Sequence, residues 1–224
     1  VSRTLAMFVL FLLVYRRVEV KIKWKDIIRL KSSYVKKIMA IGVPAAGEHL
    51  SYNTSQIIIT VFITLLGANA LATRVYTENL MALITVFSMS ISKGMQIYIG
   101  QLVGAREKQE AYHNMFRGLK YGLILTVIPS VLFAFFGENL MRIFTNKEEI
   151  IAVGAMLLAI GIILQPGKTF NLVIISALRA AGDAKFPVMM GILSMWGISV
   201  PLAYILGVHL GYGLAGVWIA MLID

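Results

Sequence analysis

The sequence contains no cysteine and carries little charge. None of its 224 residues is Cys, and only 14% are Asp, Glu, Lys or Arg, compared with about a quarter in soluble domains. The lack of Cys excludes disulfides, cysteine-bound zinc and a thiol nucleophile. The three histidines lie in separate segments, and no H-E-x-x-H or G-x-S-x-G pattern is present. We therefore expect no metal site, no cofactor and no enzymatic activity.

Long apolar segments dominate the chain instead. Hydrophobic residues make up 58% of it, and the mean hydropathy is +0.80. Several apolar stretches exceed the roughly 18 residues that indicate a membrane span. Short segments of alternating polarity, which are typical of a transmembrane barrel, are not found. The composition predicts an all-α, polytopic helical membrane protein.

The net charge of +10 is distributed over alternate loops. Most Lys and Arg residues fall within 16–37, 104–120 and 179–187. This is the distribution that the positive-inside rule predicts for a multi-pass protein, so we expect these loops to be cytoplasmic and expect no nucleic-acid partner. Residues 26–38 are predicted to form an amphipathic helix along the inner surface of the plasma (inner) membrane.

The apolar segments also define the expected domain organisation. Complete spans are predicted over residues 38–66, 71–100, 119–137, 150–177 and 186–206. The apolar runs at 4–15 and 213–224 are shorter than the roughly 20 residues that a span needs. We interpret residues 1–15 as the end of a preceding helix, 16–37 as a basic cytoplasmic linker and 38–224 as a helix bundle. We expect the last helix to be incomplete and the chain to be part of a longer, transporter-like protein.

Two charged residues inside the predicted spans are the strongest functional signal. Glu48 and Lys168 lie deep within apolar segments, where an ionisable group costs about 3 kcal/mol or more and is usually kept for function. Pro44 comes one helical turn before Glu48, and Pro166 comes just before Lys168. A proline frees a backbone carbonyl and lets the helix bend. A bent helix at a polar membrane site is typical of secondary transporters.

Polar residues recur at helical spacing around these charges. The three series are Glu48, Ser51, Tyr52, Ser55, Gln56; Arg74, Glu78, Met81, Thr85, Ser88, Ser92, Gln96; and Gln165, Lys168, Thr169, Leu172, Ser176. Steps of three and four residues place each series on one helical face. We expect these faces to line a water-accessible cavity, in which Glu48 and Lys168 could pair. Arg74 and Glu78 are expected to pair one turn apart, in a structural or a functional role.

Several local patterns match one protein family in order and spacing. They are GVPAAGEHLS at 42–51, QIYIGQLVGAREKQEA at 96–111, ALRAAGDAKFP at 177–187, WGISVPLAYILG at 196–207 and GLAGVWIAMLID at 213–224. With these motifs the chain resembles the second half of multidrug and toxic compound extrusion (MATE) transporters. The resemblance covers almost the whole chain.

The resemblance implies a twelve-helix transporter shaped as an inverted V. This chain would supply the end of helix six, the linker between lobes, and the six-helix bundle of the second lobe. The family exports cationic or amphiphilic drugs or metabolites in exchange for H⁺ or Na⁺, by alternating access. The implied partners are organic cations, membrane lipids and the missing N-terminal lobe.

The chain departs from one branch of that family at two positions. That branch has an acidic residue where this chain has Tyr52, and the carboxylate of Glu48 comes one turn earlier. It also has Asp where this chain has Lys168. We interpret Glu48 as the titratable group, although ion coupling could depend on the missing half instead. The expected substrate and ion pathway comprises Glu48, Tyr52, Ser55, Gln96, Lys168 and Asn171.

Two other functions are compatible with the residues. A lipid-linked oligosaccharide flippase of the same superfamily would need a more cationic cavity, to which Lys93 and Lys168 would contribute. A non-transporting assembly subunit would tolerate the substitution Lys168→Ala. The polar face around Glu48 and the motif at 177–187 favour drug export over the flippase.

Overall fold

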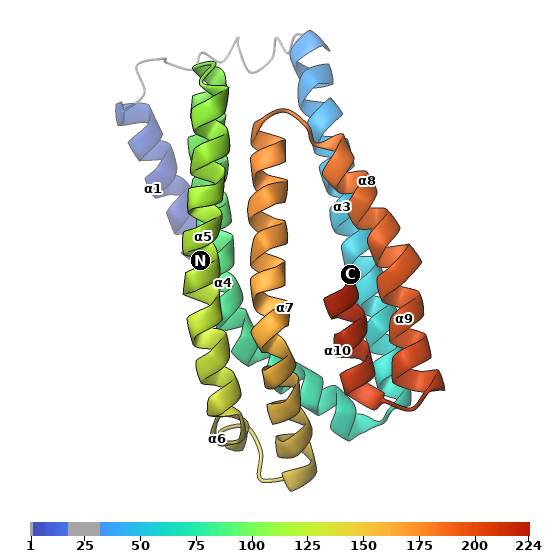
Figure 1. Cartoon of the computed structure of the whole chain (residues 1–224). Helices are drawn as coiled ribbons and strands as arrows, with labels where there is room; N and C mark the ends of the chain where they lie inside the picture. The colour runs from blue at the N-terminus through green and yellow to red at the C-terminus, as the bar shows by residue number, and fades with distance from the viewer. Residues whose placement is uncertain (1, 18–31) are drawn as a thin grey trace. The chain divides into compact units, whose positions relative to one another are not determined.

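The computed structural model describes residues 2–17 and 32–224, which contain helices and no strand (Figure 1). The first helices are α1 (Ser2–Arg17), α3 (Ser32–Leu65), α4 (Ala68–Gly104), α5 (Lys108–Phe135), α6 (Gly137–Arg142) and α7 (Glu148–Ala180). They are followed by α8 (Lys185–Ser194), η1 (Met195–Ser199), α9 (Val200–Tyr204), η2 (Ile205–His209) and α10 (Gly213–Ile223). Segments α8 to η2 form one continuous helix that contains two π-helical turns. The all-α prediction is confirmed.

Four helices are long and apolar enough to cross a membrane: Ala68–Gly104, Lys108–Phe135, Glu148–Ala180 and Lys185–His209. They correspond to four of the predicted spans, and they confirm the prediction of a polytopic membrane protein. Helix α3 is equally long but is not among them, because polar side chains occupy one of its faces and lower its hydropathy. The short helix α6 lies between the predicted spans 119–137 and 150–177 and was not predicted.

The predicted linker falls largely outside the described residues. Residues 16–17 end α1 and residues 32–37 begin α3, whereas 18–31 are not described. The amphipathic helix predicted for 26–38 therefore begins outside the described residues. Internal contacts divide the chain into two units, Val1–Val43 and Pro44–Asp224. All the predicted site residues belong to the second unit.

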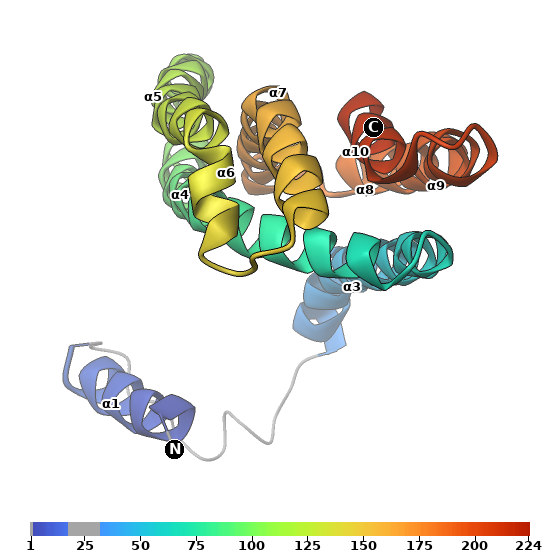
Figure 2. The ribbon, with the colours of Figure 1, turned by 90° about the horizontal axis from the view of Figure 1, so that it is seen from below.

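Within the unit Pro44–Asp224, two groups of helices meet along α7 and α10. Helices α4, α5 and α7 pack on one another, and α10 packs on both α7 and α9 (Figures 1 and 2). Helix α3 lies beside the α8–η2 helix, where the ring centroids of Phe62 and Tyr204 are 5.3 Å apart. Figure 2 shows that α4 begins near the end of α3 and runs across to α5. This crossing helix connects the part of the unit that holds α3 to the part that holds α5 and α7.

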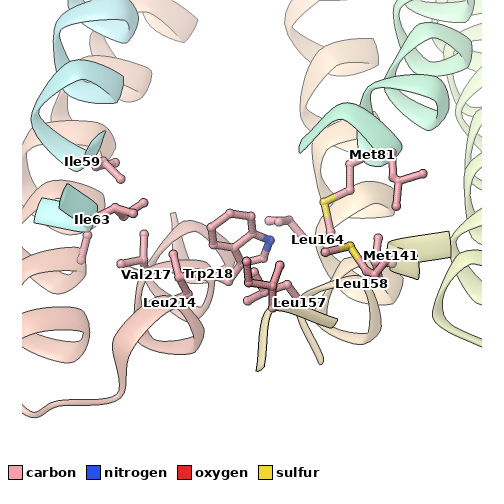
Figure 3. Packing of buried hydrophobic residues seen from close by; sticks show 14 of the residues in the cluster. Ile59, Ile63, Met81, Met141, Leu157, Leu158, Leu164, Leu214, Val217 and Trp218 are labelled. Carbon is pink, nitrogen blue, oxygen red and sulfur yellow. The ribbon is translucent and has the colours of Figure 1, made fainter. Parts of the chain in front are cut away.

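The largest apolar cluster is centred on Trp218, which is 1% exposed. Figure 3 shows its indole between Val217 and Leu214 of α10 on one side and Leu157 of α7 on the other. Ile59 and Ile63 of α3, Met81 of α4 and Met141 of α6 belong to the same cluster. One apolar core therefore connects α3, α4, α6, α7, α9 and α10, with the polar site residues placed around it.

The close approach of α10 to η2 depends on Gly216. A Cβ atom at this position would lie 2.6 Å from the backbone carbonyl carbon and oxygen of Leu206. Backbone atoms cannot yield as a flexible side chain does, so Gly216→Ala should force η2 and α10 apart. We expect the unfolding free energy to fall by about 1–3 kcal/mol, despite the higher helix propensity of Ala.

Thermal unfolding of the detergent-solubilised protein would measure this effect. Gly94→Ala is the matched control, because Gly94 is also helical and a Cβ there would meet nothing within 4 Å. The control should unfold at the parent temperature or slightly above it. Equal melting temperatures for the two variants would show that the approach of α10 to η2 does not limit stability.

Candidate functional site

Glu48 forms an ion pair with Arg179, which joins α3 to the last turn of α7. The two side chains are 21% and 27% exposed, so the pair is partly shielded from solvent. The predicted pairing of Glu48 with Lys168 is therefore wrong. Arg179 lies three turns beyond Lys168 on α7, about 16 Å along the axis. Of the two, Arg179 is the residue that reaches Glu48. The bridge crosses between the two helix groups of this unit.

Lys168 has no hydrogen-bond or ion-pair partner among residues 2–17 and 32–224. Its side chain is half-buried, and the charges that act on its ammonium belong to Glu78 and Arg74 of α4. An unpaired ammonium within an apolar helix is costly and is normally retained for a purpose. Asn171, one turn further along α7, is exposed.

Arg74 is the centre of a polar network between α3 and α4, and its side chain is buried. Its Nε donates to Glu78 Oε1 at 2.7 Å, which confirms the predicted pair. The two terminal nitrogens reach α3, where they donate to Thr60 Oγ1 at 2.7 Å and to Gln56 Oε1 at 2.9 Å. All three guanidinium nitrogens are thus used, and the fork geometry of Arg suits this arrangement. Glu78 is about half exposed and keeps one side open to solvent.

The polar faces of α4 and α7 bind each other and do not line a cavity. Ser88 Oγ and Thr169 Oγ1 are 2.7 Å apart, and Ser92 Oγ and Ser176 Oγ are 2.6 Å apart. These four hydroxyl side chains are buried. The prediction that both faces are water-accessible is therefore wrong along this stretch, because small hydroxyl residues let two helices approach closely and bond across the interface.

The other predicted site residues are dispersed. Tyr52 is 49% exposed, whereas Ser55 is 2% exposed and its Oγ lies 3.8 Å from Met195 Sδ. Ser55 therefore makes a contact between α3 and η1. Gln96 accepts a hydrogen bond from Lys93 Nζ at 3.4 Å, near the end of α4. The structure does not bring Gln96 to Glu48 or Lys168 through any direct bond.

Pro44 and Pro166 both lie inside helices that continue past them. Figure 1 shows that α7 changes direction part-way along its length. A proline removes one intrahelical hydrogen bond, so each of these helices has a point at which bending is cheap. In both helices the proline precedes the charged residue by about a turn or less. Glu48 and Lys168 therefore lie next to the position at which their helix can bend.

Sequence reasoning missed Arg179, which was assigned to an inner turn. The predicted span ended at 177, but α7 continues to Ala180, so Arg179 is still helical. Its position continues the series Thr169, Leu172 and Ser176 by one more step of three, which was the available signal. The bond from Trp196 Nε1 to Ser51 Oγ, at 2.8 Å, was also not anticipated.

Within the described ranges, no three His, Asp or Glu side chains converge on a point that could hold a metal ion. Within the predicted spans, the described helices carry two carboxylates, those of Glu48 and Glu78. Glu48 is paired with the guanidinium of Arg179, and Glu78 is paired with the guanidinium of Arg74. A competing ion at either carboxylate must therefore displace an arginine or share the carboxylate with it.

Comparison with known proteins gives a consistent result. The MatE family model matches residues 44–205. The uncharacterized transporter YisQ of Bacillus subtilis (strain 168) is 44% identical over 224 residues, which is all of this chain and 49% of the relative. The probable multidrug resistance protein NorM of Thermotoga maritima is 25% identical over 223 residues, 48% of its length. The chain spans about half the length of the curated relatives it matches.

Solved structures have the same fold. A MATE structure in the bent conformation superposes with a TM-score of 0.82 at 19% identity, covering 96% of this chain and 48% of that chain. A MOP superfamily transporter from Pyrococcus furiosus, described as having a binding pocket of reverse polarity, superposes with a TM-score of 0.77 at 22% identity. It covers 84% of this chain and 41% of that chain.

Proposed function

The chain belongs to the MatE family, and on this premise we propose that it forms the C-terminal lobe of a secondary multidrug transporter. The transporter would export cationic or amphiphilic drugs or metabolites in exchange for H⁺ or Na⁺ by alternating access. Residues 38–224 would form the lobe, and an N-terminal lobe would be its partner. The protein would cross the plasma membrane several times, with residues 16–37 and the turn after α7 on the cytoplasmic side.

The observation that supports this proposal best is the Glu48–Arg179 ion pair. It joins α3 to α7 close to the cytoplasmic end that we assign, next to a proline that makes α3 easy to bend. A proton or Na⁺ bound at Glu48 would neutralise the carboxylate and weaken its hold on Arg179. A ligand shifts a conformational equilibrium only by its differential affinity for the two states. Binding of the ion would thus favour the state in which α3 and α7 separate.

Transport by the full-length protein in vesicles tests the function directly. With an inward H⁺ or Na⁺ gradient across the vesicle membrane, ethidium should be moved outward against its own gradient. Collapsing each gradient separately with an ionophore identifies the coupling ion. Transport that is insensitive to both ionophores would overturn ion-coupled export.

Lys168 should influence which substrates bind. Because its ammonium has no partner in the described part of the chain, it repels a bound cation. Lys168→Ala should therefore lower the half-saturating concentration of an organic cation by about fivefold, equivalent to about 1 kcal/mol. Lys120→Ala is the control, since Lys120 is exposed on α5. An unchanged concentration would remove Lys168 from the pathway.

A second candidate function is supported by the same unpaired ammonium. A flippase for an anionic, lipid-linked oligosaccharide would use Lys168 to hold a phosphate group, as a point charge. In that case Lys168→Ala would weaken binding of the anionic lipid and would not change the binding of organic cations. The direction of the change in half-saturating concentration therefore separates the two functions. A non-transporting subunit would show no change for either ligand.

A further inference from the structure

An apolar groove lies between α3 and α8, at the end of α8 that carries Lys185. Its volume is about 440 Å³, and its walls are Pro44, Lys185, Val188, Met189, Ile192 and Leu193. Ligand pockets range from about 300 to 1,000 Å³, so this one could hold part of a lipid chain but not a whole phospholipid. Lys185 provides the one charged group of the wall.

The wall from α8 is a single helical face. Its members recur at steps of three and four residues from Lys185 to Leu193, which is about 12 Å along the axis. Met189 and Leu193 are 57% and 58% exposed, whereas Val188 is buried, so the outer part of this face has no protein partner in the described residues. The groove is therefore a shallow, open apolar depression that starts at a positive charge.

The groove closes where α3 and η1 come into contact. Trp196 Nε1 donates to Ser51 Oγ at 2.8 Å, and Ser55 lies against Met195 just beyond it. On the open side of this contact, a Cβ added at Gly47 of α3 would meet no atom within 4 Å. Helix α3 thus diverges from α8 over the turns between Ser51 and Pro44. Trp196, which is 39% exposed, lies one helical turn beyond the wall residues Ile192 and Leu193.

The charge at the mouth determines which occupant fits. Lys185 forms no ion pair within residues 2–17 and 32–224, and it is exposed. The carboxylate of Asp183 is held at the start of α8, where its Oδ1 accepts the backbone N–H of Phe186 at 3.1 Å; it forms no ion pair with Lys185 and is not part of the groove wall. An ammonium at this position repels an organic cation and attracts an anionic group. A cationic substrate is therefore a poor occupant.

We propose that this groove is a binding site for an anionic phospholipid of the membrane. One acyl chain lies along the apolar face of α8 and reaches Trp196, and the phosphate meets Lys185 at the end of the helix. Basic positions between spanning helices at the cytoplasmic side are known to bind lipid headgroups, and each Lys or Arg near the surface contributes to the attraction. The bound chain would fill the space between α3 and α8 and support α3 next to Glu48.

Fluorescence quenching at Trp196 tests the site. The full-length protein is reconstituted in phosphatidylcholine vesicles that contain phosphatidylglycerol, with bromine on the acyl chains of one lipid at a time. The Trp196 signal is the difference between the parent and Trp196→Phe. Brominated phosphatidylglycerol should associate with Trp196 about fivefold more strongly than brominated phosphatidylcholine, because one Lys near the surface contributes about that factor.

Two variants separate the headgroup contact from the chain contact. Lys185→Gln should remove the fivefold preference, and Lys120→Gln, at another exposed lysine, should retain it. Met189→Phe fills part of the groove and should reduce quenching by both lipids. Equal quenching by the two lipids in the parent, or a preference that survives Lys185→Gln, would overturn the proposal. So would a Trp196 that neither lipid quenches, because a protein segment would then cover the groove.

Discussion

Glu48→Gln is expected to abolish ion-driven export by the full-length transporter. The amide is close in shape to the carboxylate, but it does not take up a proton, offers Na⁺ only a neutral oxygen and cannot neutralise Arg179. Coupling free energies between ion and substrate are typically about 1–3 kcal/mol, a factor of about 5 to 150 in affinity, and losing the coupling should leave export no faster than it is without a gradient. Efflux of a fluorescent cation from energised vesicles measures the loss.

Two comparisons show whether the carboxylate itself is required. Glu48→Asp keeps the charge on a shorter side chain and should retain part of the activity. Glu138→Gln removes an exposed carboxylate from α6 and should leave transport at the parent rate. Exchange of labelled for unlabelled substrate without an ion gradient should persist in Glu48→Gln, because substrate binding remains. Gradient-driven export at the parent rate in this variant would exclude Glu48 from coupling.

Arg179→Gln separates the ion pair from the carboxylate acting alone. If ion binding works by releasing Arg179, this variant has nothing to release, and its gradient-driven export should fall as it does in Glu48→Gln. If Glu48 acts alone, export should persist. The comparison is informative because Arg179 is the ion-pair partner of Glu48 in the described part of the chain.

Helical periodicity predicted which residues share a face, but not which helix packs on that face. The series through Ser88 and Ser92 was correctly placed on one side of α4, and the pair Arg74–Glu78 was correctly predicted from its spacing of four. The partner of the α4 face is α7, and contact between them excludes the water expected there. Spacing within a helix is local, whereas the choice of partner depends on packing of the whole bundle.

The position of Glu48 relative to other charges shows the same limit. Its place on a polar face beside Pro44 could be deduced from the sequence, and Lys168 was the obvious cation in the opposite series. The shift of one helix along its axis relative to the other determines which of their turns lie side by side. The sequence does not reveal that shift. A three-residue error at the end of α7 was enough to hide Arg179, because helix ends are the least certain feature of a sequence pattern.

Arg74→Ala is expected to cause a large loss of stability, about 3 kcal/mol in the unfolding free energy. The change leaves Gln56 and Thr60 on α3 without their donor. It also removes the counter-charge of Glu78, which is half exposed and can be hydrated in part.

Titration of the protein in mixed micelles with a denaturing detergent measures this loss. Arg74→Lys should recover less than half of it, since a compact ammonium cannot reach three acceptors that are arranged around a planar fork. Arg117→Ala is the matched control, because Arg117 is exposed and its bond to His113 stays within α5. If Arg74→Ala and Arg117→Ala unfold at the same detergent fraction, the α3–α4 network contributes no net stability. The fork of Arg74 would then serve to position Glu78 towards Lys168, and Arg74→Lys should change transport without changing unfolding.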